Sequence, residues 1–150
     1  MGGVEQHMFS LAQTLSKKGH KIIVLTIAWD YQNLSGVRYI TDNIKVYYLP
    51  ILSMLSKPFY LSHMSLCGPF SILIRNILLN EQIQLVHGHQ QTSTLSINVM
   101  NIVYPMNLPF VLSQHSLHDT DGFADNLISS IYCTFNKLIV DKIICVSNIV

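Results

Sequence analysis

Charged side chains are scarce in this chain. They make up 11% of its 150 residues, nine Lys and Arg against eight Asp and Glu, so the net charge is +1. A protein that binds nucleic acid by bulk electrostatics needs a large net positive charge, so the composition does not support a nucleic-acid-binding function. Hydrophobic residues make up 49%. That content fits strands buried on both faces of a parallel sheet, or a surface that another part or a membrane covers.

Cysteine is also rare. Cys67, Cys133 and Cys145 are odd in number, far apart and set among apolar residues. This pattern predicts reduced, buried thiols on the cytosolic side and not a disulfide framework. The first residues show neither the basic segment nor the apolar run of a signal peptide.

A clean transmembrane run is missing too. The most apolar stretch, residues 51–79, carries only Lys57 and Arg75 as charges, but His63, Pro69 and Arg75 interrupt it before it approaches ~20 apolar residues. We expect a core helix and an apolar loop here. The alternative is an apolar, mildly basic lip that rests on a lipid surface.

Helical and strand patterns alternate along the chain, which predicts an α/β fold with a parallel sheet. Residues 21–27 form the continuous β-branched run of a central strand. The expected helices are residues 4–15, 69–79, 92–104 and 125–138, the first stopped by Gly19. The expected strands are residues 21–27, 44–49, 84–87, 110–113 and 142–146, with residues 31–41 as a loop or short hairpin around Ser35 and Gly36.

A glycine pair stands at the start of the first helix. Gly2 and Gly3 would let backbone N–H groups approach an anion such as a phosphate, aided by the helix dipole, and His7 lies one turn further on. In doubly wound α/β enzymes this turn follows a first parallel strand. Here nothing precedes it, so we expect a piece of an enzyme. The alternative is a plain turn before an amphipathic helix.

Histidines follow two of the expected strands, at the edge where open α/β sheets bind ligands. We expect His87 and His89 to point to opposite faces, which makes them a poor metal-chelating pair. One would pack under the loop while the other lines a cleft. His115 would project into the same cleft, where an imidazole can bond sugar hydroxyls or polarise a leaving group.

Two hydrolase classes are alternatives for these residues. His118 and Asp119 could orient His115, but no Gly-x-Ser-x-Gly nucleophile elbow occurs in the chain, which disfavours a Ser-His-Asp hydrolase. A small metal-dependent hydrolase that uses His87, His89, His115 and His118 remains a minor alternative, as does a solvated loop without a function.

Taken together, these segments resemble the family of catalytic subunits of phosphatidylinositol N-acetylglucosaminyltransferase, which begins glycosylphosphatidylinositol (GPI) anchor synthesis. The resemblance spans almost the whole chain. The residues that carry it are 1–7, 17–26, 36–41, 45–50, 87–89, 115–117, 122–125 and 143–147. Lys45–Pro50 (Lys-Val-Tyr-Tyr-Leu-Pro) and Gly122–Asp125 (Gly-Phe-Ala-Asp) separate it from general family-4-type glycosyltransferases.

The resemblance implies a GT-B glycosyltransferase, in which two Rossmann-like domains face each other across a cleft and no metal is required. It implies transfer of N-acetylglucosamine, with retention, from UDP-GlcNAc to phosphatidylinositol on the cytoplasmic face of the endoplasmic reticulum. The implied partners are the lipid, the membrane surface and other subunits of the transferase complex, and no nucleic acid. His115 would be catalytic, Gly2 and Gly3 would bind the donor pyrophosphate, and His7 and His89 would line the acceptor side.

The chain also departs from the family. The family's first strand, its donor domain and its membrane helix are absent, residues 118–121 look inserted, and Gln114 replaces an acidic residue. We therefore expect residues 1–150 to be a partial, acceptor-side N-terminal domain without transferase activity of its own. The alternative is a non-catalytic module that docks to the transferase complex.

Overall fold

A computed structural model of the chain describes residues 3–28, 35–50, 68–90, 93–115 and 139–146. The expectations for the apolar residues 51–67, for the segment 118–121 and for a helix at 125–138 fall outside these ranges. The chain divides into two compact units, Met1–Met64 and Ser65–Val150. Each unit has a sheet of its own.

The first unit begins with helix α1, Gly3–Lys17. Its end is fixed by Gly19, whose φ of 89° lies in the left-handed region. The N–H of His20 donates to the carbonyl of Leu15 at 3.2 Å, and the N–H of Gly19 to that of Ser16 at 2.9 Å, the two bonds of a Schellman motif. The predicted apolar positions all lie on the more buried side of the helix: Val4, Met8, Leu11, Ala12 and Leu15.

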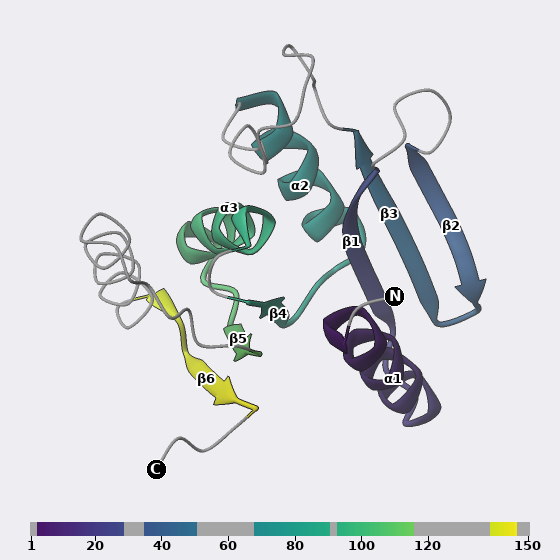
Figure 1. Cartoon of the computed structure of the whole chain (residues 1–150). Coiled ribbons are helices and arrows are strands. Elements are labelled where there is room, and N and C mark those ends of the chain that lie inside the picture. Colours follow the sequence, from purple (N-terminus) through teal and green to yellow (C-terminus); the bar gives the residue numbers. More distant parts are fainter. Residues whose placement is uncertain (1–2, 29–34, 51–67, 91–92, 116–138, 147–150) are drawn as a thin grey trace, which may run out of the picture. The chain divides into compact units, whose positions relative to one another are not determined.

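Among the described residues of the first unit, three strands form a sheet in the order β1-β3-β2 (Figure 1). β1 (Ile22–Ala28) and β3 (Ile44–Pro50) are parallel, and α1 contacts both of them. β2 (Gly36–Thr41) runs antiparallel along the other side of β3. The parallel pair agrees with the α/β prediction, and β2 makes this sheet mixed.

The prediction for residues 31–41 is wrong over residues 36–41. This segment forms β2 and not a loop, and the turn of the hairpin lies at Asp42 and Asn43. Val37 and Tyr39 favour an extended backbone. Cross-strand contacts add to the pairing, since the Lys45 Nζ lies 5.0 Å from the centre of the Tyr39 ring.

The second unit contains a fully parallel sheet in the order β4-β5-β6. β4 is Val86–His89, β5 is Phe110–Gln114 and β6 is Lys142–Cys145. Helix α2 (Gly68–Asn80) precedes β4, while helix α3 (Thr94–Val103) and the 3-10 turn η2 (Tyr104–Met106) connect β4 to β5. Both units are therefore mixed α/β, which agrees with the expected fold class, but the strands form two sheets where one parallel sheet was expected.

Two boundaries differ from the prediction. β4 begins at Val86, whose N–H donates to the Pro109 carbonyl at 2.9 Å, and it continues through His89. The histidines therefore belong to the strand itself. Helix α3 begins two positions later than expected, at Thr94, because the Ser93 side chain caps it by accepting the Ser96 N–H at 3.4 Å.

The core of the second unit is packed around Phe110, which is only 1% exposed. Gly88 in the neighbouring strand makes this packing possible. A Cβ atom at residue 88 would lie 2.6 Å from Phe110 Cζ and 3.4 Å from Leu112 Cδ1. The other buried apolar residues of the core come from α2, α3 and β5: Phe70, Ile74, Ile77, Leu78, Val99, Met100, Val103 and Leu112.

Asp141 ties the start of β6 to the start of β5. Its Oδ2 accepts the Phe110 N–H at 2.7 Å, and its own N–H donates to the Phe110 carbonyl at 3.0 Å. A carboxylate acceptor makes the first of these bonds charge-assisted. Both backbone groups of Phe110 are thus held in line with the sheet.

The prediction that the cysteines are buried is wrong for Cys145, which is free and exposed. All four residues of β6 are exposed, and β6 is the last strand of its sheet within the described ranges. Cys67 and Cys133 lie outside those ranges. None of the described helices has the length and apolar character that crossing a membrane requires.

Replacement of Gly88 by Ala should destabilise the chain by about 1–3 kcal/mol, because the added methyl group must displace a buried aromatic ring. Urea unfolding followed by circular dichroism measures the effect. Gly3→Ala is the matched control, since a Cβ there meets nothing within 4 Å. Equal unfolding midpoints for the two variants would contradict the packing described for Gly88.

Candidate functional site

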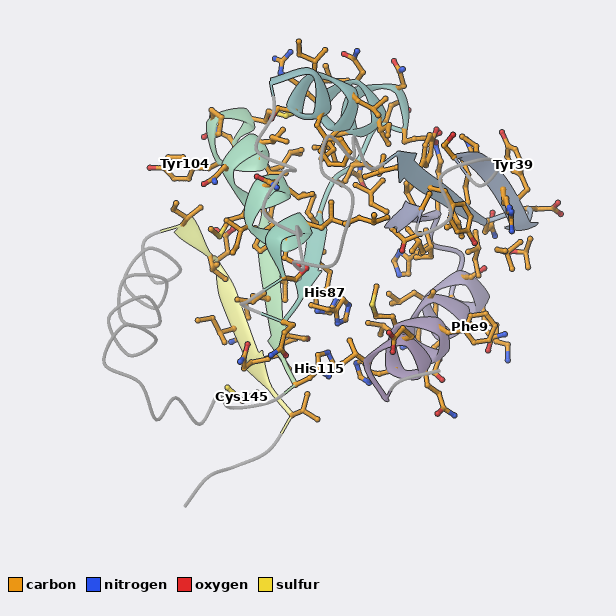
Figure 2. All side chains as sticks on the ribbon, turned by 45° about the horizontal axis from the view of Figure 1, so that its top comes forward. Phe9, Tyr39, His87, Tyr104, His115 and Cys145 are labelled. Carbon is orange, nitrogen blue, oxygen red and sulfur yellow. The ribbon has the colours of Figure 1, made fainter. Side chains whose placement is uncertain are left out.

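The candidate site lies on one face of the second sheet, at the ends of β4 and β5. The parallel register pairs His87 with Val111 and His89 with Ser113. Paired residues of neighbouring strands share a face, and side chains alternate along each strand. His87, His89 and Ser113 therefore lie on the face opposite to Phe110. His115, just past the end of β5, continues the same row, and Figure 2 shows the His87 and His115 side chains on one side of the strands.

The prediction that His87 and His89 point to opposite faces is wrong. Residues two apart in a strand lie on the same face, because the side chains alternate with a period of two. The two imidazole rings are stacked, with centroids 4.4 Å apart and an interplanar angle of 29°. Both histidines of β4 therefore lie on the same face of the sheet, whereas the sequence analysis expected only one of them to line the cleft.

His89 also contacts His115, which follows the last residue of the neighbouring strand β5. Their rings meet edge to edge, with centroids 5.3 Å apart and an interplanar angle of 25°, and His89 Nδ1 lies 3.0 Å from His115 Nε2. In a hydrogen bond between two imidazoles one ring nitrogen donates and the other accepts, so at least one of the two rings is neutral. The pair can therefore hold a proton between two nitrogen atoms.

Hydrogen bonds hold the backbone around these rings. Gln90, with a φ of 67°, turns the chain at the end of β4. Its N–H donates to the Ser113 carbonyl at 2.8 Å, and its side-chain Oε1 accepts the His115 N–H at 3.3 Å. In the first turn of α3, the Ser96 hydroxyl donates to the His89 carbonyl at 3.1 Å. The strand ends are thereby fixed to each other and to the helix that follows.

The arrangement suits hydrogen bonding and proton transfer better than metal binding. Three half-buried imidazoles, His87, His89 and His115, offer donors and acceptors at one edge of the sheet. Within the ranges that the structure describes, no three His, Cys, Asp or Glu side chains are placed to hold a metal ion. His118, which the metal-hydrolase alternative requires, lies outside those ranges.

The remaining predicted site residues belong to the first unit. Gly3 is the first residue of α1, whereas the prediction began the helix at Val4, and a Cβ atom at Gly3 would meet nothing within 4 Å. His7 lies exposed on the same helix. Gly2 is outside the described ranges. Of the predicted residues, the structure brings together His89 and His115.

Sequence reasoning missed three participants of this site. It leaves open which of His87 and His89 packs under the loop, it uses His87 only in the metal-hydrolase alternative, and it gives Ser113 and Gln90 no role. Ser113 is buried, 2% exposed, and its Oγ lies 2.8 Å from His87 Nε2. The spacing of two between His87 and His89 carried the signal for a shared face. The role of Ser113 depends on the strand register, which the sequence does not show.

Known proteins share these segments. A family model described as PIGA (GPI anchor biosynthesis) matches residues 29–125. The chain belongs to the PIGA family. The match covers β2, β3, α2, β4, α3 and β5. It therefore includes the histidine row, which consists of His87, His89 and His115.

Similar proteins come from plants, fungi and animals, and all three named here are subunits of phosphatidylinositol N-acetylglucosaminyltransferase. The chain is 40% identical over 153 aligned residues to the Arabidopsis thaliana protein. It is 36% identical over 149 to the gpi3 protein of Schizosaccharomyces pombe and 35% identical over 149 to the Homo sapiens protein. Each alignment covers 98% of this chain but 29–31% of the relative. The chain thus spans about a third of the length of these relatives. No solved structure matches it significantly.

Replacement of Gln90 by Ala should loosen the backbone at His115, because the side-chain acceptor of its N–H is removed. A hydrogen bond of about 1 kcal/mol predicts amide exchange at His115 several-fold faster. Hydrogen exchange followed by NMR measures this rate. Gln84→Ala, at an exposed residue before β4, is the control and should leave exchange at His115 unchanged. Unaltered exchange in Gln90→Ala would show that the bond does not hold His115.

Proposed function

We propose that this chain is part of an enzyme that transfers N-acetylglucosamine from UDP-GlcNAc to phosphatidylinositol, the first step of GPI-anchor biosynthesis. Membership of the PIGA family supports this proposal. So do the relatives, whose names state phosphatidylinositol N-acetylglucosaminyltransferase activity. The rest of the relatives' length leaves room for a donor-binding part.

The observation that carries the proposal for this chain is the hydrogen bond between His89 and His115 at the carboxyl edge of a parallel sheet. Open α/β sheets bind their ligands at this edge. In the proposed role, His115 lies beside the transferred sugar and donates a hydrogen bond to it or to the departing phosphate. His89, on the acceptor side, orients the His115 ring through the shared proton.

The other roles follow from the family. Gly2 and Gly3 would lie against the donor pyrophosphate at the start of α1, where backbone N–H groups favour an anion. His7, one turn along α1, would line the acceptor side. No metal takes part in the proposed reaction, and the anomeric configuration of the sugar is retained.

The larger setting is also part of the proposal. We assign residues 1–150 to the N-terminal, Rossmann-like domain of a GT-B glycosyltransferase, which faces a donor domain across a cleft. The enzyme would work at the endoplasmic reticulum membrane, on its cytoplasmic face. Its partners would be the lipid surface and the other subunits of the transferase complex, since the relatives are themselves named as subunits.

His115→Ala should lower the transfer rate by about 10²–10⁴-fold, the usual contribution of a positioned acid or base. The assay uses a chimera in which this chain replaces the aligned segment of the Saccharomyces cerevisiae GPI3 protein, to which it is 36% identical over 148 residues. Yeast membranes that carry the chimera receive labelled UDP-GlcNAc, and labelled GlcNAc-phosphatidylinositol is measured.

His20→Ala is the matched control for this assay. His20 is exposed after the end of α1 and outside the proposed site, so this chimera should retain the full rate. An active His115→Ala chimera would remove His115 from the catalytic role. An expressed but inactive parent chimera would argue against the proposed function as a whole.

The chain by itself should not produce GlcNAc-phosphatidylinositol. Stabilisation of the departing UDP needs donor groups on the far side of the cleft, and the chain spans about 31% of the Arabidopsis relative. Incubation of the purified chain with UDP-GlcNAc and phosphatidylinositol vesicles tests this. Product formation above a protein-free blank would overturn the assignment of the donor site to another part.

A further inference from the structure

His87 has no role in the proposed reaction, yet it is held as firmly as the residues that have one. Its Nε2 lies 2.8 Å from the Ser113 Oγ. Its ring is stacked on His89 at 4.4 Å. A half-buried imidazole with a fixed partner on one side and a ring on the other has little freedom to rotate.

Ser113 gives His87 a rigid anchor. It stands in β5, the central strand of the sheet, where it pairs with His89 on one side and with Ile144 on the other. Its carbonyl accepts the Gln90 N–H at 2.8 Å. Its side chain is 2% exposed, so a buried hydroxyl there depends on protein partners and not on water.

His89 lies between two other rings and makes the bond to His115 through one particular nitrogen, Nδ1. Rotation of an imidazole about its Cβ–Cγ bond has broad wells, so the side chain alone does not fix which ring atom faces His115. The His87 ring, which is stacked on one face of His89 at an interplanar angle of 29°, limits that rotation.

We infer that His87 is a positioning residue. The Ser113 hydroxyl fixes the His87 ring, the His87 ring limits the rotation of His89, and His89 thereby keeps Nδ1 directed at His115 Nε2. The effect of this device on sugar transfer rests on the proposed function. The effect of His87 on the orientation of the His89 ring does not depend on the proposed function.

The two-bond scalar coupling between His89 Nδ1 and His115 Nε2 reads the geometry directly, since it exists only while the hydrogen bond does. It is measured by NMR on the isotope-labelled 150-residue chain. The wild-type chain should show the coupling, His87→Ala should lose it, and Ser113→Ala should reduce it by more than half. Ser113→Thr keeps the hydroxyl and should restore it.

Thr14→Ala is the matched control, because the Thr14 hydroxyl donates to the Ser10 carbonyl within α1 at 2.8 Å and bonds no histidine. It should keep the wild-type coupling. The amide spectrum of each variant shows that the sheet is intact. A wild-type chain without the coupling would overturn the inference. So would His87→Ala or Ser113→Ala variants that retain the full coupling with an intact sheet.

The yeast chimera tests the consequence for activity. His87→Ala should lower kcat about 10- to 100-fold, the effect of misplacing a reacting group, while KM for UDP-GlcNAc stays unchanged. An active His87→Ala chimera beside an inactive His115→Ala chimera would refute the positioning role and leave the proposed function standing. An inactive parent chimera would refute the proposed function, and the coupling in the chain would still decide the geometry.

Discussion

The close approach of β4 and the Phe110 ring is the contact on which the second unit depends. Because Gly88 carries no side chain, the Phe110 ring can lie only 2.6 Å from the point where a Cβ would otherwise stand. The ring is buried, and Asp141 holds the backbone of Phe110 in the sheet from the other side. β4 is thereby fixed against β5 in one register. A slip by one residue would turn every side chain of β4 to the other face.

The histidine row is the direct consequence of that register. With Gly88 turned toward the core, His87 and His89 must face the other way, where Ser113 and His115 of the neighbouring strand lie. The same glycine that closes the core therefore positions the polar face. One face of β4 thus packs against the core, and the other face carries the histidines.

Much of the fold could be predicted from local patterns. The apolar spacing of α1 predicted which side of the helix is buried, and Gly19 predicted where the helix ends. The β-branched run of β1 predicted a parallel strand. β2 was missed because the hairpin turn was placed at Gly36 and not at Asp42 and Asn43, and because pairing with β3, a tertiary contact, decides the conformation of an exposed edge strand.

The sequence by itself determined the family, the alternation of helix and strand, and the presence of His89 and His115 at strand ends, because these depend on residue types and their spacing along the chain. Only the tertiary structure decided which atoms meet. The bonds from His87 to Ser113 and from His89 to His115 each join residues 26 positions apart. Their formation depends on the register of two parallel strands that a helix separates in the chain, and local spacing does not encode that register.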